Sequence, residues 1–269
     1  MNLMKSLRKY SFILWLVFLS GIGQGQSLRK RINEAFGDKE FTRFSVYYNS
    51  IITGNVTAGE ATIEVKSPKQ KVFDREVWQI VGEGKSKGAF NLFYKVRDRF
   101  ESFVDKEALI PYVFVRRTKE GSYEKDDDVV FYHEDGFAVS RKEKTPFPPY
   151  VQDFVSALFF MRTLSLQEFD ADSNYFINFL LDDSVYVSKV KYEGTEIIKT
   201  DLGIFRCLKI APMMATGEVF SDAYPVMVWV TDDKNHLPIL AEAKVIIGSV
   251  KMELIEFKNL RNPIEAKID

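Results

Sequence analysis

The sequence predicts a mostly β protein whose antiparallel sheets form two related halves, as an open half-barrel or a clam. Many short segments alternate apolar and polar residues, and turn-forming residues separate them at short intervals. Only two stretches show helical spacing: a short one at the start of the mature chain and an apolar one at about 151–164. Alternation places apolar side chains on one face of each strand, and this spacing of turns is typical of antiparallel sheets.

Composition excludes several classes of protein. The chain has 269 residues, of which 46% are hydrophobic, so it can form a sizeable core. The balance of 37 basic and 38 acidic residues gives no case for nucleic-acid binding. A single cysteine, Cys207, excludes a disulfide framework, and two histidines leave little for a histidine-based active site. We therefore expect no cofactor, no metal and no nucleic-acid partner.

The first 25 residues have the layout of a secretory signal peptide. A basic start precedes an apolar run over 12–19, and small and polar residues follow it. A membrane anchor needs about 18 or more apolar residues, so we favour a cleaved leader over an uncleaved anchor. The sequence thus predicts an exported single domain at 26–269, in the periplasm or cell envelope, and peripheral to the membrane at most.

The mature chain is expected to open with a short amphipathic helix over Ser27–Phe36. Leu28, Ile32 and Ala35 or Phe36 lie at helical spacing there, which would place them on one face.

The next residues predict a hairpin. Phe44–Asn49 alternates, Gly54 and Asn55 supply a turn, and Ala61–Val65 returns. The same alternation predicts further strands at Val77–Val81, Phe90–Val96, Tyr112–Arg117, Val129–Tyr132, Tyr175–Leu181, Val185–Tyr192, Thr195–Lys199, Phe205–Ile210, Val226–Thr231, Ile239–Ile247 and Lys251–Phe257.

The segment Val151–Leu164 predicts the buried helix. Prolines before it stop a strand, and its apolar residues cover nearly the whole helical circumference, so it must be covered on more than one side. At about 100° per residue Asp153 and Ser156 are near neighbours, whereas Arg162 lies on the side opposite Asp153. Each polar side chain then needs a partner in the surrounding sheet, because an unpaired buried charge costs several kcal/mol or more.

This helix is also the candidate ligand-binding site. Its polar residues form either a buried anchoring network or a polar head-group site inside an apolar cavity, with Arg162 available to an anionic group. The candidate residues are Arg162, Asp153, Ser156, Phe154, Leu158, Phe159, Phe160 and Met161.

A weak internal echo supports two halves. The order of strand, acidic turn, Leu with Pro, strand, glycine turn and strand occurs after Phe93 and again after Val228. The halves would span about 41–140 and 170–258, with the helix between them.

Other motifs have simpler explanations. Gly82–Gly88 ends like a phosphate-binding loop but has Gln79 where the motif needs glycine, so we expect a hairpin turn. Asp126–Asp128 lacks the spacing of a calcium loop, so we expect a solvated turn. His133 and His236 are expected in exposed turns, and Cys207 as a small buried hydrophobic residue.

Four segments resemble the exported bacterial family called domain of unknown function 3108. They are Phe44–Val65, Leu92–Phe114, Asp153–Arg162 and Glu196–Pro238, and the resemblance covers about residues 44–257. It implies export and a β-rich fold, and no established activity. Trp229–Ile239 is also similar to a strand and Leu-Pro turn of periplasmic lipoprotein carriers, which are open half-barrels around apolar helices.

Three functions follow from these expectations. The first is a non-catalytic envelope protein that binds an apolar small molecule or a lipidated envelope component in a β-rich cavity. The second is a structural or protein-interaction module of the envelope. The third is a glycan hydrolase, which would need two opposed carboxylates about 5 to 9 Å apart.

Overall fold

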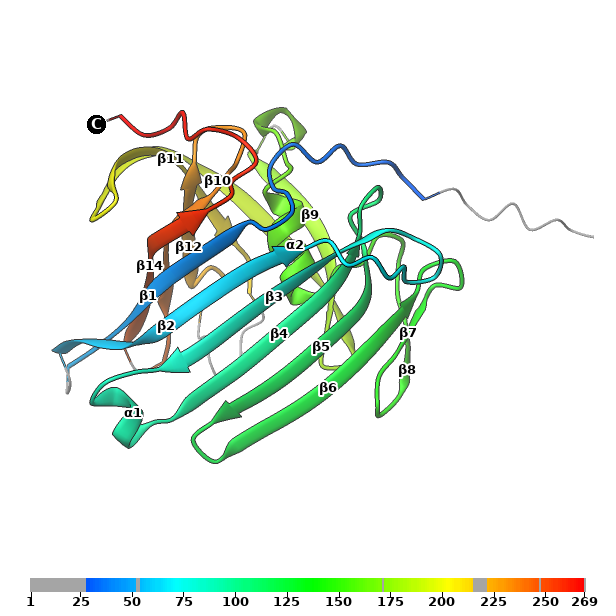
Figure 1. Ribbon diagram of the computed structural model, residues 1–269, viewed down its shortest axis with the longest axis horizontal. Helices are drawn as coiled ribbons and strands as arrows, with labels where there is room; N and C mark the ends of the chain where they lie inside the picture. The colour runs from blue at the N-terminus through cyan, green and yellow to red at the C-terminus, as the bar shows by residue number, and fades with distance from the viewer. Residues whose placement is uncertain (1–27, 52–53, 171, 215–221, 247, 269) are drawn as a thin grey trace, which may run out of the picture.

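The protein folds as one continuous antiparallel sheet that curves around a helix. The computed structural model describes residues 28–51, 54–170, 172–214, 222–246 and 248–268 (Figure 1). Its 14 strands follow the order β8-β7-β6-β5-β4-β3-β2-β1-β14-β13-β12-β11-β10-β9. The strands are β1 (Phe41–Ser50), β2 (Gly54–Lys66), β3 (Val77–Ser86), β4 (Val96–Asp105), β5 (Pro111–Glu120), β6 (Tyr123–Tyr132), β7 (Phe137–Val139), β8 (Lys144–Pro146), β9 (Asn174–Leu181), β10 (Ser184–Thr200), β11 (Gly203–Pro212), β12 (Val226–Thr231), β13 (Pro238–Lys244) and β14 (Ser249–Lys258).

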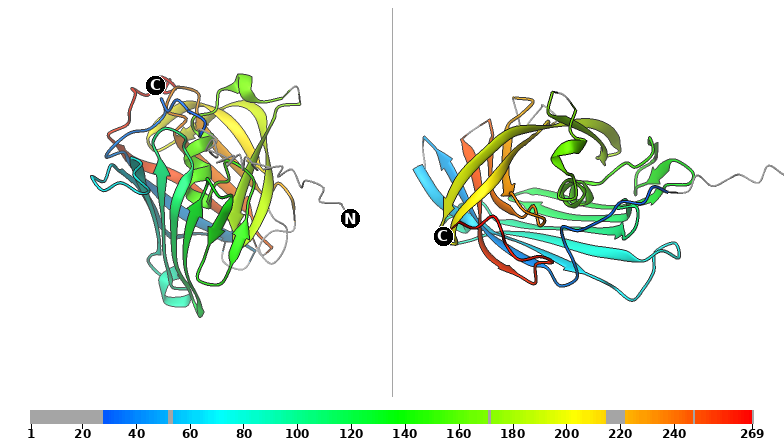
Figure 2. Two further views of the ribbon diagram at one scale, coloured as in Figure 1. Left: turned by 90° about the vertical axis from the view of Figure 1, so that its right-hand side faces the viewer. Right: turned by 90° about the horizontal axis from the view of Figure 1, so that it is seen from above.

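The first and last strands meet in the middle of the sheet. β1 pairs with β14, so the N-terminal strands β2–β8 extend to one side and the C-terminal strands β13–β9 to the other. The two limbs curve towards each other, and the helix α2 (Phe154–Met161) lies inside the curve (Figure 2). Among the described strands β8 and β9 are the two ends, so hydrogen bonds between strands do not close the sheet into a barrel. The predicted open half-barrel is confirmed, as one sheet.

Side chains connect the limbs where the backbone does not. Asp182, in the β9–β10 turn, forms ion pairs with Arg116 on β5, at 3.2 Å, and with Lys125 on β6. The α2 helix contacts β3 and β4 on one limb and β9 on the other. The helix therefore lies between the two limbs and contacts both.

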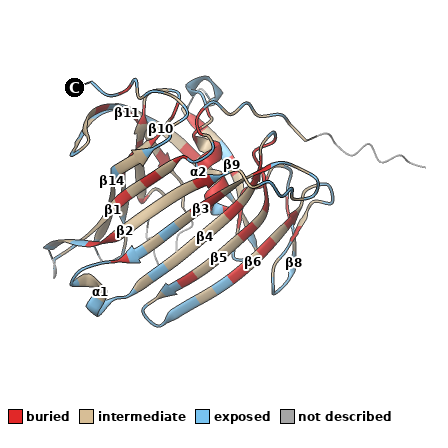
Figure 3. Cartoon of the chain, viewed as in Figure 1, coloured by how far each residue is buried: buried red, intermediate tan, exposed pale blue. Residues whose placement is uncertain are grey.

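Two apolar cores stabilise the curve. The larger core surrounds α2, where the Phe36 and Phe159 rings lie 4.8 Å apart at 86°. The second core joins Phe44 on β1, Leu254 on β14 and Phe205 on β11. Buried residues concentrate where the strands pass α2, whereas the lower ends of β3–β6 are mostly intermediate or exposed (Figure 3).

The predicted N-terminal helix is wrong. Residues 28–36 form an irregular segment, in which the Asn33 side chain accepts hydrogen bonds from the backbone N–H groups of Ala35 and Phe36. Such side-chain bonds compete with helix formation. Ile32 is 79% exposed while Phe36 is fully buried, so the spacing does not mark one buried face.

Three local predictions are also wrong. Phe90–Val96 is not one strand, because Phe90–Phe93 forms the short helix α1 before β4 begins at Val96. Most of Gly82–Gly88 belongs to β3 rather than to a turn. Asp126–Asp128 lies in β6, where Asp126 and Asp128 both form ion pairs with Arg117 on β5. A strand in which charged residues follow one another cannot be recognised from apolar spacing, because its sequence is only a polar run.

One long strand stands where the sequence predicts two. Val185–Tyr192 and Thr195–Lys199 are one strand, β10, with a bulge at Gly194, whose φ of 117° favours glycine. The predicted helix at 151–164 is real but shorter. Before it, Gln152 extends alongside β9 and pairs with Phe179. The relationship between the two halves as repeats stays a prediction.

We expect Phe160→Asp to lower the free energy of unfolding by roughly 3 kcal/mol or more, because it removes a buried ring from the core and buries a carboxylate in its place, even though the Arg29 guanidinium lies 4.6 Å from that ring. Phe160 is 3% exposed, whereas Leu158 on the same helix is 37% exposed. Leu158→Asp is therefore the matched control and should cost much less. Urea unfolding measures both. Equal losses would contradict the orientation of α2.

Candidate functional site

A row of apolar side chains crosses one face of the sheet. In the strand register Val46 lies opposite Met252, Met252 opposite Ala241, Ala241 opposite Val228, and Val228 opposite Ile210. The row runs over β1, β14, β13, β12 and β11. All five residues are half-exposed, so the protein leaves them partly in contact with solvent.

A second row runs beside the first. Tyr48 lies opposite Val250, Val250 opposite Ala243, and Ala243 opposite Val226, and all four are half-exposed. We call the two rows together the apolar band. Its members are Val46, Tyr48, Ile210, Val226, Val228, Ala241, Ala243, Val250 and Met252.

The apolar band lies on the concave face. Ile210 packs against the core cluster that contains Phe159 and Phe160 of α2, so the face that carries Ile210 is the face that α2 occupies. α2 lies inside the curve of the sheet (Figure 2). The band is therefore the part of the concave face that continues beyond the helix.

The opposite face of the same strands mixes charged and apolar residues. Tyr47, Lys251 and Glu242 form a row across β1, β14 and β13, one residue out of step with the band. Beside them Glu253 on β14 forms an ion pair with Lys251 at 2.9 Å. The convex face also carries Met227, Trp229 and Leu240, but charged residues lie opposite or beside them, so the concave face has the more continuous apolar rows.

The predicted polar residues at the start of α2 form a buried cap. Asp153 is the N-cap: its Oδ1 accepts from the Ser156 backbone N–H at 2.7 Å, and its backbone N–H donates to Ser156 Oγ at 2.8 Å. Ser102 Oγ on β4 donates to Asp153 Oδ2 at 2.5 Å. Burial raises the pKa of Asp153 to about 6, although these hydrogen bonds oppose the shift. The structure thus brings Asp153 and Ser156 together and anchors them to the sheet.

Arg162 is occupied by protein groups. Its Nη1 and Nη2 donate to the two carboxylate oxygens of Glu40, at 2.5 and 3.2 Å. Its Nε donates to the Asn235 carbonyl at 3.1 Å, and Nη2 also reaches the Ala35 carbonyl at 3.3 Å. Arg162 is 5% exposed and the Glu40 side chain 2%. This is the buried anchoring network, and it leaves no free guanidinium fork for an anionic ligand.

The apolar candidates on α2 divide between two environments. Phe159 and Phe160 are each 3% exposed, and Met161 is half-buried against the same core. Phe154 and Leu158, four residues apart, are 41% and 37% exposed. The helix is covered on more than one side, as the sequence predicts, by β3, β4 and β9. Its Phe154 face remains partly open beside the Phe100 ring, 5.9 Å away.

Another part of the same face carries ionisable groups. Gly84 on β3 lies opposite Asp98 on β4, and Asp98 opposite Thr118 on β5. Burial and the neighbouring charge of Glu120 raise the pKa of Asp98 to about 6. The two carboxyl groups share a hydrogen bond, so they are closer than the roughly 5 Å or more that glycosidase carboxylates require.

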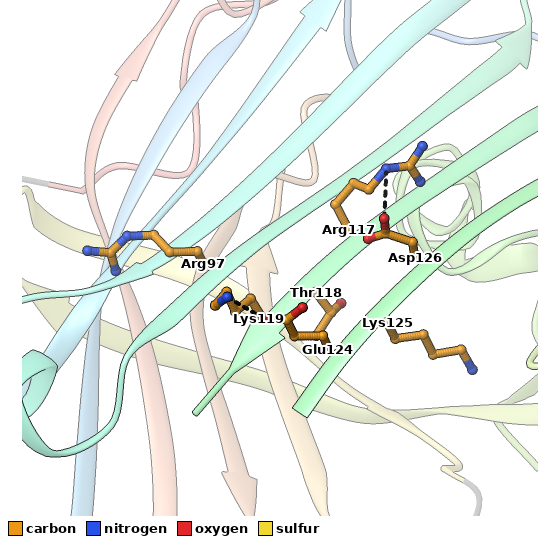
Figure 4. Close-up of a pocket in the computed structure, with 7 residues that line it drawn as sticks. All are labelled: Arg97, Arg117, Thr118, Lys119, Glu124, Lys125 and Asp126. Atoms are coloured by element: carbon orange, nitrogen blue, oxygen red, sulfur yellow. Dashed lines mark hydrogen bonds and ion pairs between the residues drawn. The ribbon is translucent and has the colours of Figure 1, made fainter. Parts of the chain in front are cut away.

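A shallow polar pocket of about 320 Å³ lies at the ends of β4–β6. Its charged side chains are largely paired, as Arg117 with Asp126 and Lys119 with Glu124 (Figure 4). The lining residues are Arg97, Arg117, Thr118, Lys119, Glu124, Lys125 and Asp126. It offers no apolar wall, so it is distinct in chemistry from the apolar band.

The other candidate groups are structural. Both histidines lie in turns but are half-buried, which corrects the prediction of exposed turns: His133 Nε2 donates to the Pro111 carbonyl at 2.7 Å, and His236 Nδ1 to the Arg162 carbonyl at 2.7 Å. Burial lowers the pKa of His133 to about 4 and raises that of Cys207 to about 12. Within the described residues there is no cluster of His, Cys, Asp and Glu that could bind a metal ion.

Comparison with known proteins agrees with this architecture. The model of the family described as "Protein of unknown function (DUF3108)" matches residues 43–255. The chain belongs to the DUF3108 family. No curated protein matches this DUF3108 protein.

Two solved structures are similar to it. A β-barrel-like protein of domain of unknown function DUF1849 from Brucella abortus has a TM-score of 0.52 at 12% identity, over 86% of this chain and 99% of that one. A protein with a YmcC-like fold from Bacteroides fragilis has a TM-score of 0.32 at 11% identity, over 86% of this chain and 100% of that one. The Brucella structure alone supports the fold. No helix in the described part of this DUF3108 protein is long and apolar enough to span a membrane.

Sequence reasoning missed the apolar band. The signal was present in β13 and β14, where Ala241 and Ala243 alternate with Glu242, and Val250 and Met252 alternate with charged residues. Alternation shows that a strand has one apolar face. It does not show whether another element covers that face, and here the covering helix stops short of it.

We expect Asp98→Asn to raise the free energy of unfolding at pH 7. A carboxyl whose folded pKa is raised to about 6 binds its proton more tightly in the folded state than in the unfolded state. It therefore stabilises the folded protein at low pH, and this contribution to the free energy of unfolding is lost as the pH rises from about 4 to 6. Asparagine stays neutral throughout. Urea unfolding at pH 4 and pH 7 should therefore show a gain for the variant only at pH 7; a gain of equal size at both would contradict the shifted pKa.

Proposed function

We propose that this DUF3108 protein is an exported, non-catalytic envelope protein that binds an apolar or lipidated ligand on its concave face. One observation carries the proposal: the apolar band is half-exposed on the face that a closed core would occupy. Removing apolar surface from water contributes about 25 cal/mol per Å², so a ligand that covers the band would bind by that effect. The basic and apolar N-terminal segment supports an envelope location.

The dimensions of the apolar band favour a long, narrow ligand. The first row crosses five strands, and neighbouring strands lie about 4.8 Å apart, so it spans roughly 19 Å. Ala241 and Ala243 in its centre have small side chains, so a ligand there can approach the backbone. An acyl chain has this length and width, whereas a compact ring system would cover only part of the row.

Recognition of the ligand should depend on its apolar part. Arg162 was the candidate for an anionic head group, but Glu40 already neutralises it. The band itself contains no charged residue, and Tyr48 is its single polar side-chain group. We therefore expect a fatty acid and its uncharged ester to bind with similar affinity. The same band could then bind either a free fatty acid or the acyl chain of a lipidated protein.

We expect Ala241→Gln to weaken binding of a fluorescent fatty acid about 5- to 100-fold, because the ligand must then desolvate an amide in the centre of the band. Glu242→Gln is the matched control: it places the same side chain one residue away on the convex face, and its affinity should equal that of the wild type. Displacement titration on the mature protein measures both, and circular dichroism checks folding.

The opposite results are equally clear. If the folded wild type binds no fatty acid, or if both glutamine variants bind as the wild type does, the concave face is not the site. The envelope interaction module would then be the better account.

A further inference from the structure

The helix α1 presents apolar side chains that no core uses. Leu92 is 82% exposed and Phe93 89%, and Tyr94, directly after the helix, is 43% exposed. None of the α1 residues is buried. Three consecutive large apolar residues at the tip of the β3–β4 connection are unfavourable in water. They therefore indicate a surface that a lipid surface or another molecule covers.

Basic residues flank this tip in the sequence. The segment from Lys85 to Arg97 contains four basic residues and no acidic one, although the whole chain is nearly neutral. Lys87 forms an ion pair with Glu60, and Lys85 lies 3.7 Å from the same carboxylate. Among the described residues Lys95 and Arg97 have no carboxylate within ion-pair distance, and both are exposed. The tip therefore carries two basic side chains without an ion-pair partner beside its apolar side chains, and the carboxylates nearest to Tyr94 are those of Glu120 and Asp98.

The tip is held in place and is continuous with the apolar band. The Phe90 ring of α1 lies 6.0 Å from the ring of Tyr48, which belongs to the band. On the other side the Gly121 backbone N–H, in the β5–β6 turn, donates to the Lys95 carbonyl at 2.9 Å. Figure 1 shows α1 projecting at the connection between β3 and β4, and it also contacts β2. The Tyr94 ring lies 6.3 Å from the Phe90 ring, so the apolar path runs from Tyr94 through Phe90 to Tyr48.

We propose that α1 docks the protein onto an anionic lipid surface. Leu92 and Phe93 would insert at the boundary of headgroups and acyl chains, while Lys95 and Arg97 contact lipid phosphates. A projecting tip of this kind enters a bilayer readily, whereas an apolar protein groove would need a longer helix to occupy it. Docking does not depend on the proposed ligand; the route for an acyl chain from Phe90 to Tyr48 rests on the proposed function.

The experiment uses the mature chain and sedimented vesicles of phosphatidylcholine, with or without phosphatidylglycerol. We expect partition into the anionic vesicles, and a loss of roughly tenfold or more for the variant Leu92→Ser with Phe93→Ser. Lys95→Glu with Arg97→Glu should abolish the preference for the anionic vesicles. Phe176→Ser is the matched control, since Phe176 is 57% exposed on β9, far from α1 in sequence, and should bind as the wild type does.

Three outcomes would overturn docking at α1. They are no partition by the folded wild type, equal partition of the wild type and the Leu92 and Phe93 variant, and a lipid-free dimer that the same variant converts to a monomer. The last would assign α1 to contact with a second copy, and sedimentation velocity without lipid detects it. Fatty-acid binding in solution is measured separately. Vesicle binding without fatty-acid binding would contradict only the proposed function. Fatty-acid binding without vesicle binding would contradict only the docking.

Discussion

The buried ion pair between Arg162 and Glu40 fixes the arrangement on which the rest of the structure depends. It joins the residue before β1 to the end of α2, and Arg162 also binds the Asn235 carbonyl in the β12–β13 turn. His236 in that turn donates to the Arg162 carbonyl. Removing one partner of such a buried pair leaves an uncompensated charge and costs about 3 to 5 kcal/mol. Three segments distant in sequence are therefore held together at one end of the helix.

The other end of α2 is held just as firmly. Asp153 caps the helix and accepts from Ser102 on β4, while Gln152 pairs with β9. With both ends anchored, α2 cannot slide across the concave face. The helix lies between the two limbs at one end of the concave face. It leaves the apolar band, which lies beyond the helix on the same face, uncovered. In this account the polar network around α2 has a structural role, and the ligand is recognised by the strands. The ligand-binding role of the α2 residues themselves stays a prediction.

The sequence predicted the class of fold because strand alternation and the apolar helix depend on local spacing. It predicted that Asp153 and Ser156 would be neighbours for the same reason. It could not identify Glu40 as the partner of Arg162, since the two are 122 residues apart and only the fold brings them together. Nor could it show that Phe154 and Leu158 remain exposed, because apolar spacing does not tell which neighbours are missing. The helix predicted at 27–36 failed because Asn33 bonds its own backbone there.

The central claim is that an apolar ligand lies against the concave face of the β1–β14–β13–β12–β11 strands. The most direct test is paramagnetic broadening of methyl NMR signals by a spin-labelled fatty acid. The account predicts broadening of the methyl groups of Val46, Ala241 and Val228, and little effect on Met227, which neighbours Val228 on the other face. Equal broadening of Met227 and Val228, or none in the apolar band at saturating ligand, would contradict it.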